Sequence, residues 1–250
     1  MTAVSSAAQR VAIVGGGLAG SLLALALSER GYEVDVFERR GDPRADGAES
    51  GRSINLGLSK RGIQALTEVG LIDMVMPMTV VMRGRVIHAP DGSTRFQPYG
   101  KNGGEVLYSI DRSELIRLLL DRAERQPGVK LHFEHRFVSA DKERRELEIE
   151  SEGTVRRVAA DWVICADGAF SRCRPEMQHG LRADYHREYL EWGYKELSLA
   201  AGPDGQSMID LTALHVWPRA HCLFVSHPNR DGSHTLTLFL PHEGPDSFET

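Results

Sequence analysis

The sequence has little that would suit a secreted, metal-binding or nucleic-acid-binding protein. Its 250 residues include only three cysteines, Cys165, Cys173 and Cys222, which form no CxxC motif and cannot all pair. Lys and Arg are scattered and the net charge is −5, so we expect no nucleic-acid partner. Only His132 and His135 have ligand-like spacing, and on one strand residues three apart face opposite sides. We therefore expect no metal site, and a cytoplasmic protein with reduced thiols.

Long apolar runs are equally scarce. Residues 11–28 lack charge and follow Arg10, so the run could be read as a signal peptide or a membrane span. Three consecutive glycines interrupt it at residues 15–17, and Glu29-Arg30-Gly31 closes it like an ordinary helix C-terminus. We therefore expect no membrane segment in this chain. With 41% hydrophobic residues, the chain can bury a substantial core, in one large or two small domains.

The most informative motif surrounds these glycines. A short apolar strand pattern and a long helix pattern flank Gly15, Gly17 and Gly20, which fill the three glycine positions of a dinucleotide-binding fingerprint. Glu38 ends the next apolar run, 18 residues after Gly20, where a carboxylate can accept hydrogen bonds from an adenosine ribose. The pattern predicts that a pyrophosphate binds the free N–H groups at the start of the helix.

Strand patterns in the middle of the chain distinguish between fold classes. Three patterns, at residues 129–138, 145–151 and 155–160, form a meander that leads into an apolar run ending at Asp167-Gly168. Nicotinamide dehydrogenases normally cross over with helices here, so the meander favours the Rossmann variant of flavin enzymes. Asp167 and Gly168 would then lie at the carboxyl edge of a central strand, where open α/β sheets bind ligands.

The predicted fold is therefore α/β, a Rossmann-like FAD-binding domain with a β-meander, of the glutathione-reductase type. We expect this domain over residues 1–75 and 109–177. A strand-rich substrate domain, interleaved with it, is expected over residues 76–108 and 178–250. The latter includes two predicted hairpins, one turning at Pro90-Asp91-Gly92 and one at residues 228–232.

The first hairpin suggests a binding pair. If it turns on residues 90–93, Arg85 and Tyr99 lie nearly opposite each other across the ladder, allowing for a bulge. A guanidinium fork and a phenol make a suitable clamp for an amino-acid carboxylate. An exposed cross-strand cation–π pair is the alternative, and the residues alone leave both interpretations open.

Several of these motifs together resemble a known family. Gly15–Gly20 with Glu38, Arg112 and Asp167-Gly168 resembles the aromatic-hydroxylase class of FAD-dependent monooxygenases. Three further stretches narrow the resemblance to the kynurenine 3-monooxygenase family, and it runs from about Val11 to the end of the chain. These stretches are GRSINLGLSKRG (Gly51–Gly62), MRGRVIHAPDG with FQPYG (Met82–Gly100), and LHVWPR with TLFLP (Leu214–Pro241).

The resemblance implies FAD as cofactor and NADPH as reductant. FAD would lie over the first βαβ unit, and the kynurenine carboxylate would bind Arg85 and Tyr99. Dioxygen would add at the flavin C4a, and the hydroperoxide would hydroxylate the ring next to its amino group, without a catalytic acid–base pair. The candidate cofactor contacts are Gly15, Gly17, Leu18, Ala19, Gly20, Glu38, Arg39, Arg40, Asn55, Leu56, Arg112, Phe137, Asp167 and Gly168.

Two differences from the family leave alternatives open. Family members continue well past residue 250 and carry a later Gly-Asp-Ala-type motif, so a non-catalytic fragment without flavin is one alternative. His227, His234 and His242 replace apolar or aromatic residues of the family. If these side chains face the aryl pocket, a related aromatic amino acid is the alternative substrate.

Overall fold

The computed structural model describes residues 8–45, 54–102, 104–178 and 184–249. Two compact units are present, and each is built from two chain segments. The first unit comprises residues 1–50 and 114–185, and the second comprises residues 51–113 and 186–250. Within the described ranges, no helix has the length and apolar character needed to cross a bilayer. Gly51, Arg52 and Ser53 of the first family-like stretch lie outside the described residues.

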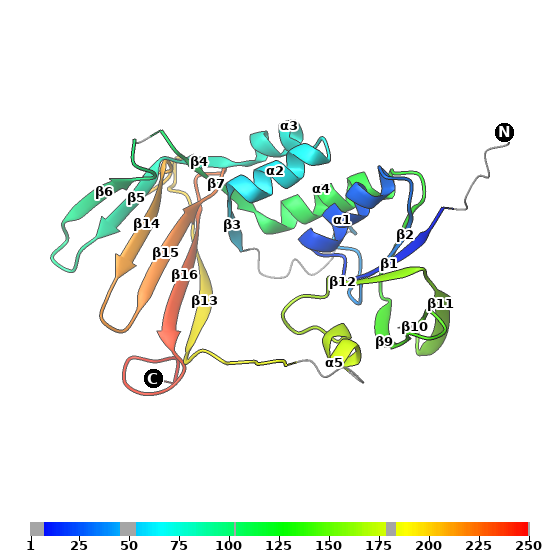
Figure 1. The fold of residues 1–250 in the computed structure, drawn as a ribbon. Helices are drawn as coiled ribbons and strands as arrows, with labels where there is room; N and C mark the ends of the chain where they lie inside the picture. The colour runs from blue at the N-terminus through cyan, green and yellow to red at the C-terminus, as the bar shows by residue number, and fades with distance from the viewer. Residues whose placement is uncertain (1–7, 46–53, 103, 179–183, 250) are drawn as a thin grey trace. The chain divides into compact units, whose positions relative to one another are not determined.

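The first unit is built on a four-stranded parallel sheet (Figure 1). Its strand order is β12-β1-β2-β8, with β1 at Arg10–Val14, β2 at Glu33–Phe37, β8 at Val129–His132 and β12 at Trp162–Cys165. Helix α1 (Leu18–Ser28) joins β1 to β2, as predicted, and α4 (Arg112–Glu124) precedes β8. Because all four strands run in parallel, the residues that follow them gather at one edge of the sheet.

The predicted meander is present in this unit. Strands β9 (Arg136–Asp141), β10 (Glu146–Ser151) and β11 (Thr154–Ala159) form an antiparallel sheet in the order β11-β10-β9. Its apolar side chains form one buried cluster with those of the parallel sheet and of helix α5 (Cys173–Gln178). The cluster contains Ala12, Val14, Phe37, Phe137, Leu147, Ile149, Ala160 and Cys173. The α/β fold with a meander is therefore confirmed.

One strand prediction in this region is wrong. Residues 129–138 are not a single strand, because the chain turns at residues 133–135 between β8 and β9. Glu134 adopts a left-handed φ of 59° in this turn. The two strands join different sheets, a change of partner that the alternating apolar pattern does not reveal.

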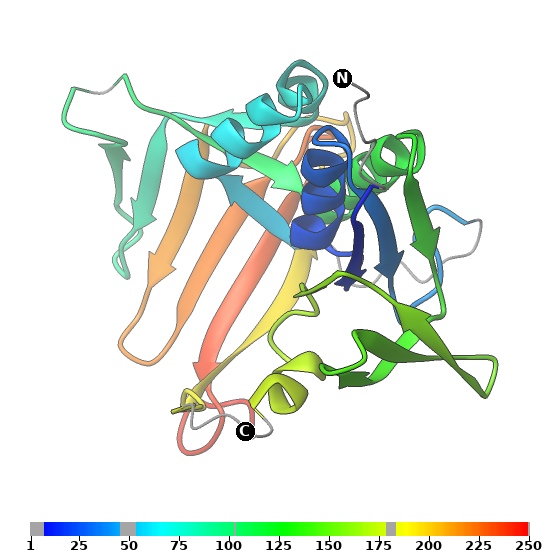
Figure 2. The same ribbon diagram turned by 45° about the vertical axis from the view of Figure 1, so that its right-hand side comes forward.

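The second unit contains a six-stranded sheet, the large twisted sheet of Figure 2. The strand order is β13-β16-β15-β14-β5-β6, and only the β14–β5 pair is parallel. Both predicted hairpins are present, as β5–β6 and β15–β16. The strands are β5 (Gly84–His88), β6 (Thr94–Pro98), β13 (Trp192–Leu199), β14 (Ala213–Pro218), β15 (Leu223–Pro228) and β16 (His234–Pro241).

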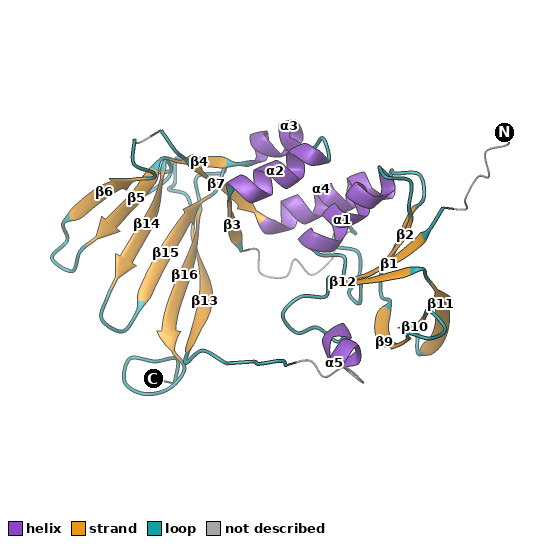
Figure 3. Ribbon diagram, viewed as in Figure 1, coloured by secondary structure: helices purple, strands orange, loops and turns teal. Residues whose placement is uncertain are grey.

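A smaller sheet and three short helices complete the second unit (Figure 3). The sheet has the order β3-β7-β4, from β3 (Asn55–Leu58), β7 (Leu107–Asp111) and β4 (Val80–Met82). The helices are α2 (Lys60–Glu68), α3 (Ile72–Val75) and the 3-10 helix η1 (Met76–Met78). Residues 80–89 (VVMRGRVIHA) have the pattern of one continuous strand, but the structure divides them between β4 and β5. The pattern breaks at Arg83, whose N–H donates to the Thr212 carbonyl (2.7 Å) while its carbonyl accepts from the Tyr99 N–H (3.1 Å).

Candidate functional site

The glycine turn lies at the carboxyl edge of the parallel sheet. Gly15 has φ of 109°, and its N–H donates to the Phe37 carbonyl at 2.8 Å. A Cβ at this position would lie 2.5 Å from the Ala166 carbonyl oxygen, which follows β12. A side chain is therefore excluded twice, by the backbone conformation and by the neighbouring strand. The same contact places the turn directly beside Asp167, as the sequence predicted.

The other two fingerprint glycines have different roles. A Cβ on Gly20 would lie 1.9 Å from the Gly15 carbonyl oxygen, so this glycine lets the helix pack against the turn. A Cβ on Gly17 would meet none of the described atoms within 4 Å. The protein itself therefore does not require a glycine at position 17. Its missing side chain leaves open space beside the backbone.

This open space lies at the beginning of α1. Gly17 is the N-cap residue, and it makes no side-chain capping bond. The N–H groups of Leu18, Ala19 and Gly20 lie in the first turn, where an α-helix offers them no internal acceptor. Ala19 is exposed and Leu18 half-buried, and the first turn carries no acidic side chain. Free N–H groups at the positive end of a helix, next to open space, suit a diphosphate.

Glu38 points toward the glycine turn and is only 8% exposed. Its Oε2 accepts a hydrogen bond from the Gly16 N–H at 2.9 Å. Its Oε1 accepts from the backbone N–H and the Nε of Arg40, at 3.0 and 3.1 Å. The backbone is held as well, because the Glu38 N–H donates to His132 and the Glu38 carbonyl accepts from His135, both at 2.9 Å. A carboxylate has further acceptor sites, so ribose hydroxyls can still donate to it.

Asp167 is near the glycine turn, but its carboxylate is already engaged. Oδ1 accepts from the Ser171 hydroxyl at 2.7 Å, and Oδ2 accepts from the Arg172 and Cys173 N–H groups at 2.7 and 3.1 Å. Burial favours the neutral acid, but these hydrogen bonds outweigh it and lower the pKa of Asp167. Asp167 thus orders the loop before α5. Gly168, with φ of 80°, has open space where a Cβ would be, and its backbone can approach a ligand.

Three further candidates of the first unit differ in position. Arg39 and Arg40 are exposed beside Glu38, with the Arg40 guanidinium paired to that carboxylate. The Phe137 side chain is 5% exposed and packs in the buried cluster under the meander. The first unit therefore brings together Gly15–Gly20, Glu38, Asp167 and Gly168, and directs the ring of Phe137 into the core.

Asn55, Leu56 and Arg112 belong to the second unit. The Asn55 side chain is 5% exposed and links β3 to the β15–β16 hairpin. Its Nδ2 donates to Ser109 Oγ, the Pro228 carbonyl and Asn229 Oδ1, and its Oδ1 accepts from Thr235 Oγ1. With its side chain fully used, Asn55 has only its backbone to offer a ligand. Leu56 pairs with Ile110 on β7, and the Arg112 N–H donates to the Ile54 carbonyl at 3.2 Å.

Arg85 and Tyr99 are also in the second unit and are in contact. Arg85 pairs with Gln97 across the hairpin, and Tyr99 lies two residues further along. The Arg85 Cζ is 5.4 Å from the centre of the Tyr99 ring. The Tyr99 hydroxyl is buried and has no hydrogen-bond partner among the described residues. Burial raises the pKa of Tyr99, with the Arg85 charge opposing part of the rise, so the phenol stays protonated and can donate.

His227 shares one face of the six-stranded sheet with Arg85. Arg85 pairs with Leu214, and Leu214 lies opposite His227, since the next pair is His215 with Ser226. Residues in one cross-strand row project from the same face. His227 is half-buried, and burial lowers its pKa, so its imidazole is neutral near pH 7. The sequence signalled this position only through its departure from the family pattern.

The opposite face of this sheet carries a buried histidine network. His215 Nε2 donates to the Asp210 carbonyl at 2.8 Å, and its Nδ1 accepts from His88 Nε2 at 2.9 Å. His234 lies between the hydroxyls of Ser226 and Ser207, each 2.9 Å from one ring nitrogen. Burial, with a contribution from His215, lowers the pKa of His234 to about 4. His234 is therefore a neutral core residue on the face opposite to Arg85.

The prediction that His132 and His135 face opposite sides of one strand is wrong. His132 ends β8 and His135 follows the turn, so their rings come within 5.4 Å of each other instead of facing opposite sides. His132 Nε2 contacts Asp35 Oδ1 at 2.8 Å, and His135 Nδ1 contacts the Phe133 carbonyl at 2.6 Å. Across the described ranges, no group of three or more His, Cys, Asp or Glu side chains is arranged to hold a metal ion.

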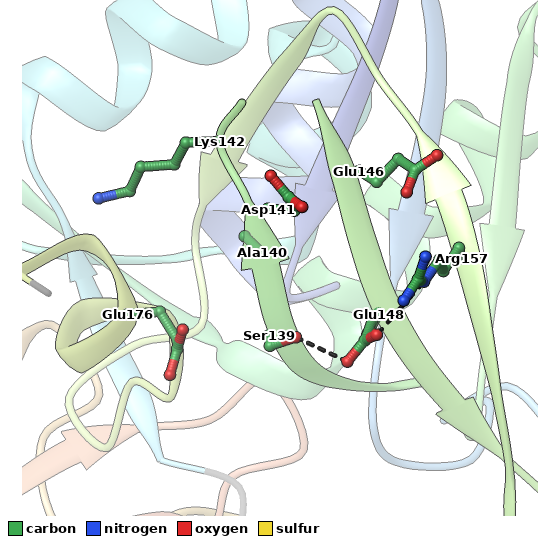
Figure 4. Close-up of a pocket in the computed structure, with 8 residues that line it drawn as sticks. All are labelled: Ser139, Ala140, Asp141, Lys142, Glu146, Glu148, Arg157 and Glu176. Carbon is green, nitrogen blue, oxygen red and sulfur yellow. Dashed lines mark hydrogen bonds and ion pairs between the residues drawn. The ribbon is translucent and has the colours of Figure 1, made fainter. Parts of the chain in front are cut away.

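A cavity of about 430 Å³ lies against the meander and α5, and the sequence did not predict it (Figure 4). At its lower rim in Figure 4, Glu148 accepts a hydrogen bond from Ser139 Oγ (2.8 Å) and pairs with Arg157 Nε (3.4 Å). The alternating glutamates of β10 were the only sequence signal for this cavity. None of the candidate residues lines it. The lining residues are Ser139, Ala140, Asp141, Lys142, Glu146, Glu148, Arg157 and Glu176.

Comparison with known proteins shows the family to which the chain belongs. A family model described as "FAD binding domain" matches residues 8–221. Kynurenine 3-monooxygenase of Salinispora tropica is 54% identical over 243 residues, which are 96% of this chain and 54% of that protein. The enzyme of the same name from Stenotrophomonas maltophilia is 41% identical over 249 residues, 99% of this chain and 54% of that protein. The chain thus spans about half the length of the curated relatives it matches.

Solved structures share the fold. The tetrameric form of 2-methyl-3-hydroxypyridine-5-carboxylic acid oxygenase matches with a TM-score of 0.75 and 23% identity, over 96% of this chain and 61% of that chain. A C294A mutant of the same oxygenase matches with a TM-score of 0.73 and 24% identity, over 94% of this chain and 59% of that chain. At these identities the likeness concerns the fold alone.

Proposed function

Because the chain belongs to the FAD-binding domain family, we propose that it holds FAD and serves the NADPH- and dioxygen-dependent hydroxylation of L-kynurenine to 3-hydroxykynurenine. One observation carries the proposal. The glycine turn, the open space at Gly17 and the Glu38 carboxylate converge at one sheet edge in a single unit. The similarity to enzymes named kynurenine 3-monooxygenase supports the choice of substrate.

The residues of the first unit fit the nucleotide half of FAD. The first-turn N–H groups of α1 would bind the diphosphate, and Glu38 would accept hydrogen bonds from the adenosine ribose. Gly168 would let the backbone approach the cofactor closely. Once bound, FAD supplies the redox chemistry that activates dioxygen, and the protein positions the substrate and excludes water.

The second unit would supply the substrate clamp. Arg85 offers a planar fork of N–H donors for the kynurenine carboxylate, and the buried Tyr99 hydroxyl offers one more. A buried hydroxyl without a partner is costly, and a ligand acceptor would satisfy it. We further propose that Arg112 and the backbone at Asn55 and Leu56 contact the flavin part of the cofactor, as in the family.

These assignments give each part of the chain a separate role. We propose that residues 1–75 and 109–177 serve FAD and that residues 76–108 and 178–250 serve the substrate. NADPH would reduce the flavin without a second fingerprint of its own. We place the protein in the cytoplasm, because Cys165, Cys173 and Cys222 are all free.

The proposal is tested on purified protein supplied with FAD. We expect a yellow protein that oxidises NADPH faster when kynurenine is added and that forms 3-hydroxykynurenine, identified by chromatography. A protein that takes up no FAD contradicts the cofactor assignment and supports a non-catalytic fragment. If the flavin-loaded protein oxidises NADPH at the same rate with and without kynurenine, only the substrate assignment is contradicted.

A second candidate substrate class is favoured by His227. A neutral imidazole on the same sheet face as Arg85 can hydrogen-bond to a polar group on an aromatic ring, which an apolar residue cannot. A ring-substituted aromatic amino acid with such a group is therefore the alternative. If His227→Leu improves kynurenine turnover and weakens turnover of a ring-hydroxylated analogue, the alternative is preferred. The reverse result supports kynurenine.

A further inference from the structure

Three sulfur atoms lie together beside the Asp167-Gly168 turn. Cys165 ends β12, Cys173 begins α5 and Met177 lies one turn later on the same helix. Cys165 packs against the buried cluster that contains Cys173. The Cys165 Sγ is 3.5 Å from Met177 Sδ. The two cysteines, eight positions apart in the sequence, are therefore neighbours in space.

The loop between the cysteines is held in a closed form. The Cys173 N–H donates to Asp167 Oδ2 at 3.1 Å, and the Ser171 hydroxyl donates to Asp167 Oδ1 at 2.7 Å. These bonds fold the chain back so that α5 begins against the end of β12. Cys173 is 1% exposed within the buried cluster, and the half-buried Cys165 packs against that cluster. The sulfur contact is therefore built into the hydrogen-bonded loop.

The two thiols differ in reactivity. The neighbouring Cys173 thiol favours the thiolate of Cys165 and lowers the pKa of Cys165. The neighbouring Cys165, together with burial, raises the pKa of Cys173. Because a thiolate is the nucleophile and Cys165 is the more accessible of the two, Cys165 reacts first and Cys173 acts as its resolving partner.

We propose that Cys165 and Cys173 form a dithiol modification site that hydrogen peroxide converts into a disulfide. The Cys165 thiolate attacks a peroxide oxygen, so that an S–O bond forms, the O–O bond breaks and hydroxide leaves. Hydroxide removes the Cys173 proton as water. The Cys173 sulfur then attacks Cys165, the S–S bond forms, and the S–O bond breaks to release a second hydroxide, which takes up the proton first lost by Cys165. Two thiols lose two electrons, and the peroxide becomes two waters.

The disulfide would tie the end of β12 to the first residue of α5 and enclose Asp167 and Gly168. A flavin oxygenase that reduces dioxygen without hydroxylating its substrate releases hydrogen peroxide, so the oxidant is at hand if the proposed function holds. The reactivity of the pair does not depend on FAD. A failure of this inference therefore leaves the proposed function untouched, and the converse also holds.

The test is peptide mapping of peroxide-treated protein. Free thiols are alkylated after treatment, and the protein is digested with trypsin without reduction. Cys165 falls in VAADWVICADGAFSR (158–172) and Cys173 in CRPEMQHGLR (173–182), because the Arg174–Pro175 bond resists trypsin. We expect the two peptides to appear linked, lighter by two hydrogen atoms than their sum, and to separate on reduction. Cys222 is the internal control, and it should react at least about tenfold more slowly than Cys165.

Several outcomes would overturn the inference. These outcomes are the recovery of both peptides in alkylated form, the conversion of Cys165 to a sulfinic acid without a link, and the oxidation of Met177 alone. In Cys173→Ser the link should vanish, and a sulfenic acid on Cys165 should become trappable by dimedone. In Cys222→Ser the link should remain. If Cys173→Ser does not fold, Cys165→Ser serves instead, and Cys173 should then stay alkylatable after peroxide treatment.

Discussion

The glycine turn of the first unit and the Arg85–Tyr99 pair of the second are built in opposite ways. The turn is assembled from residues close in sequence, and its geometry follows from backbone conformation at Gly15 and packing at Gly20. Arg85 and Tyr99 sit on a hairpin whose first strand also pairs with β14, more than 120 residues away. The comparison indicates that the conformation of the glycine turn depends mainly on local backbone geometry and the Arg85–Tyr99 contact on strand register.

The largest effect is expected at Gly15. Gly15→Ala adds a Cβ in a left-handed conformation, 2.5 Å from the Ala166 carbonyl oxygen. We expect a loss of about 2–5 kcal/mol in the free energy of unfolding, measured by urea denaturation, together with loss of FAD binding.

Gly17→Ala is the matched control, because its Cβ enters open space. Its free energy of unfolding should stay within about 1 kcal/mol of the wild type, while FAD affinity falls. If Gly17→Ala kept full FAD affinity, the diphosphate would not lie at this residue, and the local account of the turn would fail.

The buried His234 should make the protein less stable in acid. The pKa of His234 is lowered to about 4, while that of an unfolded histidine is about 6.5, so the unfolded chain binds a proton that the folded chain does not. The free energy of unfolding should therefore fall by up to about 3 kcal/mol between pH 6.5 and pH 4.

His234→Gln keeps a donor and an acceptor but removes the titration. We expect a flatter pH profile than in the wild type, measured by thermal or urea unfolding at several pH values. The exposed His186 is the control, since His186→Gln should leave the profile unchanged. Identical profiles for the wild type and His234→Gln would show that the buried face does not control acid stability.

Arg85→Ala tests the proposed substrate clamp, which lies on the opposite face of the six-stranded sheet from His234. Arg85 is exposed before substrate binds, so we expect the loss of kynurenine affinity to be about 2 kcal/mol, roughly thirtyfold in Kd. Arg95→Ala, an exposed arginine on the adjacent strand β6, is the control with the same change of charge. The kynurenine affinity of both variants is measured by titration calorimetry with FAD-loaded protein. Equal affinities would show that Arg85 and Tyr99 are only a surface pair.

The smallest effect is expected for Glu38→Gln, which removes the charge and keeps the shape. We expect FAD affinity to fall by about 1 kcal/mol, because one acceptor for the ribose hydroxyls is replaced by a donor. Glu33→Gln, an exposed residue of the β2 strand that precedes Glu38, should leave FAD affinity unchanged. An unchanged FAD affinity in Glu38→Gln, measured by flavin fluorescence, would remove Glu38 from the cofactor site.

Much of the fold follows from local patterns that the sequence displays. Helix α1 (Leu18–Ser28) follows the glycines as predicted, and the meander lies where the alternating residues predict it. The breaks at Arg83 and at residues 133–135 were not predicted. In each case the two halves of one strand-like pattern pair with strands of different sheets. The β3 strand was likewise missed, since it is stabilised by pairing with β7.

The candidate site residues also fall into two groups, those that sequence spacing identifies and those whose role only the fold reveals. The glycines and Glu38 could be identified from spacing. The use of Asp167 to cap α5, of Asn55 to link β3 to a hairpin, and of His234 as a core residue could not. In each of these cases a polar side chain is committed to partners that only the folded chain supplies.

By itself, the sequence determined the βαβ unit, its three glycines and the acid that follows, because backbone sterics and helix periodicity act over a few residues. Only the tertiary structure decided which face of the sheet His227 and His234 occupy, and that Cys165 and Cys173 become neighbours. Strand register depends on hydrogen bonds between segments far apart in the chain, and the loop between the cysteines closes through the hydrogen bonds that Asp167 accepts.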